Sequence, residues 1–153
     1  MSEVRISKEI EALASATVNA ALTVHRTLGP GLLESAYQEC LAVELTSSGF
    51  RVQREQMLPL SYRGHTIQNA YRVDLVVDDQ LLVETKAIES IQPIHRVQTT
   101  TYLRLLKLPL GLLINFNVPL IKDGIHRILN LDFREAVAAD SFAPTLAPSR
   151  LRA

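Results

Sequence analysis

The sequence has few cysteine and few aromatic residues. It contains one cysteine and no tryptophan in 153 residues, and aromatic residues make up only 5%. The single thiol, Cys40, excludes an internal disulfide and an iron–sulfur cluster held by several cysteines. No stretch approaches the roughly 20 apolar residues that a transmembrane helix needs, and the N-terminal residues lack the apolar segment of a signal peptide. We therefore expect a cytoplasmic protein without a membrane partner.

The chain also carries no formal net charge at pH 7, because its 16 basic and 16 acidic residues cancel. This balance excludes a global field that would draw the protein onto nucleic acid, so any such binding depends on a local patch. Hydrophobic residues make up 47% and charged residues 21%, which is ordinary globular usage. A chain of this length suits one domain with a real core. We assign that domain to residues 1–133 and expect the Ala- and Pro-containing segment 134–153 to be a mobile tail.

Hydrophobic periodicity predicts the order of helices and strands. Two helical segments, 7–28 and 32–48, come first. The period then changes to two, and three antiparallel strands are expected within 50–88. Pro93 opens a third helix, and the continuously apolar run 109–117 is typical of a buried strand. The predicted fold class is α/β, with a mixed β-sheet flanked by helices.

Charged residues interrupt the apolar strands of the stretch YRVDLVVDDQLLVETKAI, residues 71–88. Side chains on a strand alternate faces, so Glu84 and Lys86 share one face. A three-residue turn after Val77 sets Asp74 directly opposite Glu84 and places Arg72 across from Lys86. Two like charges about 5 Å apart repel unless a positive charge lies between them. Lys86 or a divalent cation could supply that charge.

The simplest alternative is that these side chains lie on a solvated face of the hairpin. We favour a partly covered face, because the helices on both sides of the hairpin in the sequence need a sheet to pack against. Carboxylate oxygens suit Mg²⁺ or Mn²⁺, which keep several waters and take one or two protein carboxylates. Lys86 could then orient or deprotonate the attacking water, or stabilise charge on a phosphoryl group.

The spacing of these charged residues resembles a known signature. Asp74, nine intervening residues and then Glu84-x-Lys86 resemble the PD-(D/E)xK nuclease motif, with Val73 in place of the usual proline. This resemblance implies a restriction-endonuclease-like core and catalytic roles for Asp74, Glu84 and Lys86.

A second motif lies at the start of the second helical segment. Gly31-x-x-Glu34-x-x-Tyr37 resembles the family named GxxExxY, which is itself placed within the PD-(D/E)xK fold, and the similarity covers about residues 7–131. The resemblance implies that Glu34 completes a metal cluster with Asp74 and Glu84. Tyr37 is a candidate substrate contact, with packing as its equal alternative.

A third motif lies in the predicted third helix. Gln98 and Tyr102 fit the QxxxY pattern that follows the Glu-x-Lys strand in RecB-type nucleases. Residues four apart project from one helical face, so both side chains could contact a DNA phosphate or strand end.

Together these resemblances imply a divalent-metal-dependent nuclease that uses Mg²⁺ (or Mn²⁺) to hydrolyse DNA phosphodiester bonds. The rival is a non-catalytic PD-(D/E)xK-fold module that binds nucleic acid or protein, since fold does not fix function. Hydrolysis of RNA or of a nucleotide is a third reading. Nucleases of this fold often pair, so a homo-oligomer also stays open.

Overall fold

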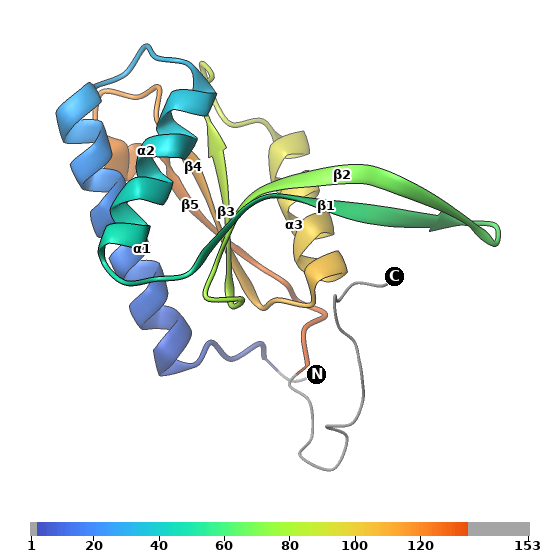
Figure 1. The fold of residues 1–153 in the computed structure, drawn as a ribbon. Coiled ribbons are helices and arrows are strands. Elements are labelled where there is room, and N and C mark those ends of the chain that lie inside the picture. Colours follow the sequence, from blue (N-terminus) through green and yellow to red (C-terminus); the bar gives the residue numbers. More distant parts are fainter. Residues whose placement is uncertain (1–2, 135–153) are drawn as a thin grey trace.

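The computed structural model describes residues 3–134, so the predicted tail lies outside the described residues except for its first position. Figure 1 shows the elements in chain order. They are α1 (Lys8–Leu28), α2 (Glu34–Ser47), β1 (Val52–Tyr62), β2 (His65–Val77), β3 (Leu81–Lys86), α3 (Pro93–Leu106), β4 (Leu110–Asn115), the 3₁₀ helix η1 (Ile121–Gly124) and β5 (Ile125–Leu129).

The strands form one mixed sheet in the order β1-β2-β3-β4-β5. Neighbouring strands are antiparallel except for β3 and β4, which run parallel. A parallel pair needs a crossover connection, and α3 provides it. Helices α1 and α2 cover one face of the sheet and α3 covers the other (Figure 1). The predicted α/β class with a mixed sheet is confirmed.

The sheet separates two apolar clusters, one on each face. Leu75 and Val83 belong to the cluster beneath α1 and α2, whereas Leu82 and Leu103 belong to the cluster beneath α3. Consecutive residues of β3 therefore enter opposite clusters, as the alternation of a strand requires. Each fully buried aliphatic side chain contributes about 1.5–3 kcal/mol, so the sheet is held firmly from both sides.

The turn between β2 and β3 confirms the predicted register. Val77 pairs with Leu81, and the N–H of Gln80 donates to the carbonyl of Val77 at 2.9 Å. Asp78 and Asp79 adopt positive φ values of 49° and 56°, a conformation that aspartate tolerates better than most residues. The odd-length loop thus keeps the acids of both strands at the same level.

Strands β1 and β2 continue past the sheet as a projecting two-stranded ribbon (Figure 1). We call residues 57–72 the β-arm. Its tip is a two-residue turn, Arg63 and Gly64, with positive φ values of 49° and 80° that suit a tight hairpin. The register shifts between Leu58 and Leu60, where Pro59 cannot donate a hydrogen bond to the ladder. Among the described residues, no helix is long and apolar enough to cross a membrane.

Candidate active site

Asp74 and Glu84 lie side by side where the pairing of β2 and β3 ends. The last backbone pair is Leu75 with Val83. One step further, the N–H of Asp74 donates to Oε2 of Glu84 at 2.8 Å, and the N–H of Thr85 donates to Oδ2 of Asp74 at 2.8 Å. Each carboxylate therefore accepts a backbone hydrogen bond from the opposite strand. The predicted juxtaposition of the two acids is present.

The regular alternation of side chains between the two faces of the sheet is interrupted in β2 at Asp74. Val73 and Val76 both pack in the cluster beneath α3, although residues three apart on a regular strand point to opposite faces. The β1 residue between the pairs Arg54–Leu75 and Gln56–Val73 is Glu55, which has a positive φ of 52°. This local distortion turns the Asp74 carboxylate toward the end of β3.

Because of this distortion, Arg72 does not lie where the hairpin register predicts. The antiparallel register placed Arg72 across from Lys86, but Arg72 pairs with Met57 of β1, and the pairing of β2 with β3 stops at Leu75. Beyond Asp74, β2 follows β1 into the β-arm. The prediction failed because it extended one ladder through the bend.

Each of the two acids keeps one oxygen without a hydrogen bond from the described residues. The Oγ1 hydroxyl of Thr85 also donates to Oδ2 of Asp74, at 3.0 Å, so both bonds from Thr85 go to the same oxygen. Within residues 3–134, nothing donates to Oδ1 of Asp74 or to Oε1 of Glu84. The pair thus presents two oxygens that are available to a cation.

The two carboxylates are buried, and the positive charges near them do not offset the cost of burying negative charge. Asp74 and Glu84 are only 7% and 5% exposed. Burial, and then the neighbouring Asp74 charge, raises the pKa of Glu84 to about 8. Burial also raises the pKa of Asp74, against the opposing effect of the Thr85 hydrogen bonds. A cation at this point would favour the ionised form of both acids.

Glu34 belongs to the same electrostatic environment, at the N-terminus of α2. Burial raises the pKa of its half-buried carboxyl, Lys86 lowers it, and Asp74 raises it. One turn later, Nε2 of Gln38 donates to the carbonyl of Asp74 at 3.4 Å. Sequence reasoning missed Gln38, whose signal was its four-residue spacing from Glu34 on one helical face.

Tyr37 is a core residue in this structure, not a surface one. Its side chain is fully buried and stacks on Phe116 with ring centroids 4.7 Å apart. Its hydroxyl donates to the carbonyl of Gly29 at 2.5 Å and accepts the N–H of Leu32 at 3.1 Å. The structure thus shows the packing alternative for Tyr37, with its hydroxyl fixing the loop before Glu34.

Lys86 ends β3, two residues after Glu84, and is half-buried. Its carbonyl accepts the N–H of Phe116 at 2.9 Å. The side chain of the neighbouring buried Asn115 donates to the carbonyl of Ile88 at 2.9 Å and accepts the N–H of Ile88 at 3.1 Å. Asn115 therefore fixes the chain just after Lys86. The sequence signal for it was an asparagine at the end of an apolar run.

Helix α3 brings Tyr102 to the acids but leaves Gln98 in solvent. Burial, followed by the Glu84 and Asp74 charges, raises the pKa of the Tyr102 phenol. Its ring meets Tyr71 edge-on at 5.9 Å. Gln98 is exposed one turn earlier on the same helix. Within the described residues, no hydrogen bond joins Gln98 to the acidic pair.

The donor set fits a small hard cation held by few protein ligands. No group of three or more His, Cys, Asp or Glu side chains is arranged to hold a metal within residues 3–134. The predicted three-acid cluster is therefore not formed as such, and Glu34 stands beside the pair. Mg²⁺ commonly takes only one or two carboxylates and completes its shell with water and substrate phosphate. The two available oxygens of Asp74 and Glu84 satisfy that requirement.

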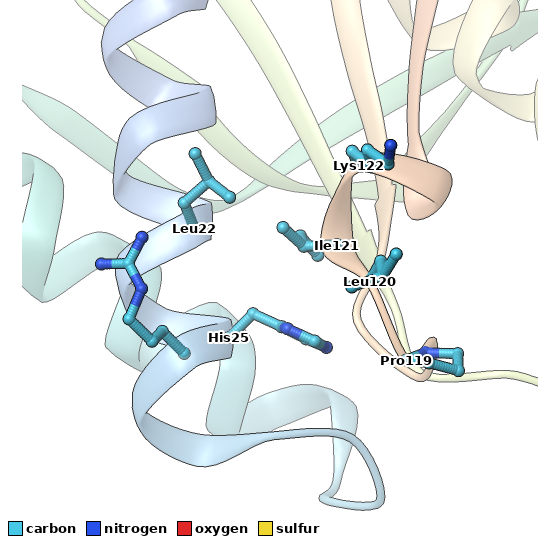
Figure 2. A pocket seen from close by; sticks show the side chains of 7 residues that line it. Leu22, His25, Pro119, Leu120, Ile121 and Lys122 are labelled. Carbon is cyan, nitrogen blue, oxygen red and sulfur yellow. The ribbon is translucent and has the colours of Figure 1, made fainter.

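A separate hollow lies between the end of α1 and the segment before β5 (Figure 2). The ring of His25 points toward this segment, and its Nε2 bonds to the carbonyl of Val118 at 2.7 Å. Among residues 3–134, no carboxylate lines the hollow. Its lining residues are Leu22, His25, Arg26, Pro119, Leu120, Ile121 and Lys122.

Comparison with known proteins identifies this arrangement. The family model described as the PD-(D/E)XK nuclease superfamily matches residues 11–128. The chain belongs to the PD-(D/E)XK nuclease superfamily. No curated protein and no solved structure matches the chain. The match spans α1 through β5 almost completely, and the mixed five-stranded sheet flanked by three helices is consistent with the nuclease-like core of this superfamily. Members of this superfamily generally use divalent metals and act on nucleic acid.

Proposed function

We propose that this PD-(D/E)XK protein is a divalent-metal-dependent nuclease that hydrolyses phosphodiester bonds of DNA. The observation that carries the proposal is the juxtaposition of Asp74 and Glu84, each of which accepts a backbone N–H from the opposite strand, with Lys86 two residues further along β3. A binding module has no use for two desolvated acids that repel each other, whereas a metallonuclease needs them.

In this proposal Asp74 and Glu84 hold Mg²⁺ or Mn²⁺ through their available oxygens, and Glu34 adds negative charge beside them from the N-terminus of α2. The bound ion would polarise the phosphoryl oxygen and acidify a water. Thr85 and Gln38 hold the carboxylate and the backbone of Asp74 in place. These residues preorganise the negative site before substrate arrives.

The remaining groups act on water and substrate. Lys86 orients the attacking water or stabilises charge on the phosphoryl group. The Tyr102 phenol stays protonated because burial and two acids raise its pKa, so it can donate a hydrogen bond to a phosphate oxygen. Gln98 extends the same contact from the exposed part of α3. We also propose that the chain is a member of the GxxExxY group, because Gly31, Glu34 and Tyr37 match its motif.

The experiment is a cleavage assay on end-labelled linear duplex DNA, circular DNA, single-stranded DNA and RNA, with Mg²⁺, Mn²⁺ or EDTA. We expect DNA cleavage that requires the metal, and nicking of the circle would identify an endonuclease. Cleavage of RNA alone would contradict the assignment to DNA. Absence of cleavage on all four substrates would favour the non-catalytic binding module. A cytoplasmic location and self-association stay predictions from the sequence.

A further inference from the structure

The distal part of the β-arm, residues 61–69, projects from the sheet, and no helix of the described residues 3–134 covers it (Figure 1). Every residue from 61 to 69 is exposed, on both strands and at the turn. A two-stranded hairpin alone is only marginally stable in water. The ribbon is therefore expected to have a partner in its working state.

The composition of the β-arm differs from that of the whole chain. Acidic and basic residues balance over the 153 positions, but residues 57–72 contain no Asp or Glu and include Arg63, His65 and Arg72. Most of the other polar side chains on the ribbon can also donate hydrogen bonds. They are Ser61, Thr66, Gln68 and Asn69. This surface is suited to an acceptor-rich, negatively charged partner.

Ion pairing differs between the arginines of the β-arm and those near the start of β1. Arg51 pairs with Asp79 and Arg54 pairs with Glu39. Neither Arg63 nor Arg72 forms an ion pair among residues 3–134. The charges of Arg51 and Arg54 are thus neutralised, whereas those of Arg63 and Arg72 are available to a partner.

The β-arm is continuous with the candidate active site. Arg72 lies two residues before Asp74 on β2, and its charge acts on both Asp74 and Glu34. At about 3.3 Å per residue, the strand from Arg72 to Arg63 spans about 30 Å. This length corresponds to roughly nine phosphate steps of B-DNA, and a two-stranded ribbon fits its major groove.

We propose that the β-arm binds the phosphate backbone of duplex DNA and holds the duplex across the acidic pair. The inference rests on the proposed function for its choice of DNA. Arg72 contacts a phosphate next to the cleaved bond, and the tip with Arg63 and His65 contacts the duplex further away. The zero net charge of the chain is then no obstacle, because binding depends on this local surface.

A second copy of the chain is the competing partner. Tyr62 and Ile67 are 59% and 46% exposed on the distal ribbon, and they could meet their equivalents. However, stable interfaces bury about 800 Å² on each partner, which two side chains do not supply. Two β-arms would also bring like charges together, so charge favours DNA.

The test measures equilibrium binding, so that it does not depend on cleavage. Fluorescence anisotropy of a short labelled duplex is followed in the Glu84→Gln background of the full chain, at several salt concentrations. One variant adds Arg63→Ala. Another replaces residues 61–66 by Asn-Gly, which joins the paired residues Leu60 and Ile67 by a two-residue turn. The control is Arg51→Ala, which removes an exposed arginine outside the β-arm.

We expect Arg63→Ala to raise the Kd about fivefold and to reduce the salt slope by about one ion, as loss of one phosphate contact requires. The shortened β-arm should weaken binding more, whereas Arg51→Ala should change little. Wild-type affinity in both β-arm variants would overturn the proposal. If circular dichroism shows that the shortened variant is unfolded, Arg63→Ala decides alone.

Two other outcomes distinguish DNA from a second copy of the chain as the partner, and the β-arm inference from the proposed nuclease function. If sedimentation shows a dimer that the shortened β-arm converts to a monomer with unchanged DNA affinity, the β-arm is an interface between copies and the DNA proposal is overturned. If DNA binding depends on the β-arm but the wild-type protein cleaves nothing, the nuclease function fails and the β-arm inference stands.

Discussion

The backbone N–H of Asp74 donates to Oε2 of Glu84 at 2.8 Å, so the strand that carries one acid anchors the other. This bond takes the place of the next rung in the β2–β3 ladder. The two carboxylates are thereby held close in a buried setting in spite of their mutual repulsion. Their burial and pairing have consequences for stability, activity and metal binding.

Glu84 makes the stability of the metal-free protein dependent on pH. Its pKa is raised from 4.5 to about 8 in the folded protein, so the folded state binds the proton more tightly than the unfolded state. Stability should therefore fall as pH rises from about 4.5 to about 8. Thermal melts of wild type and Glu84→Gln over this range measure the effect. The wild-type Tm should decline more steeply, and parallel curves would contradict the assignment.

Thr85→Val removes the hydroxyl bond to Asp74 but keeps the shape of the side chain. The bond of 3.0 Å favours the ionised carboxylate, so its loss should raise the pKa of Asp74 further. A hydrogen bond to a charged group contributes about 1.5–3 kcal/mol. We expect cleavage to fall about tenfold or more, and its acidic limb to move to higher pH. Thr101→Val, which removes a hydroxyl bond on α3, is the matched control and should leave the pH profile unchanged.

Tyr37→Phe tests the loop-fixing role of the buried hydroxyl. The change removes the bonds to Gly29 and Leu32 while the stacking on Phe116 remains. Leaving backbone groups unsatisfied should cost about 1–3 kcal/mol of the free energy of unfolding. Urea denaturation measures this loss. Unchanged stability, together with a weaker substrate affinity, would favour the substrate-contact alternative over packing.

Tyr102→Phe tests the phenol on α3 as a phosphate donor. The ring keeps its edge contact with Tyr71, so stability should change little. Loss of one hydrogen bond to a phosphate should lower kcat/KM roughly tenfold or more. Tyr71→Phe is the matched control, since it removes a hydroxyl from the other ring of the pair. Equal effects of the two changes would contradict a specific donor role for the Tyr102 hydroxyl.

The hairpin shows what sequence alternation can predict. A period of two and a three-residue turn were enough to pair Val77 with Leu81, and hence to bring Asp74 and Glu84 together. Such features depend on local geometry and on residues close in the chain. The buried strand β4 and the Pro93 helix start were predicted for the same reason.

The features that the sequence did not predict depend on distant partners. The bend at Asp74 arises where β2 leaves β3 and continues with β1, so the position of Arg72 was wrong. The apolar pattern of α3 places Val97 on the same buried face as Leu103, but Val97 is 57% exposed, because α3 covers the sheet with a narrower face than its apolar residues suggest. Gln38 acquires its role only through contact between α2 and β2.

The most direct test of the central claim compares Asp74→Asn with Asp79→Asn. Both changes replace one carboxylate by an amide in the same hairpin, but Asp79 is an exposed turn residue paired with Arg51. Mg²⁺ binding is measured by calorimetry, in parallel with cleavage of duplex DNA. We predict that Asp74→Asn abolishes both and that Asp79→Asn retains both. Wild-type metal binding and cleavage in Asp74→Asn would contradict the proposed active site.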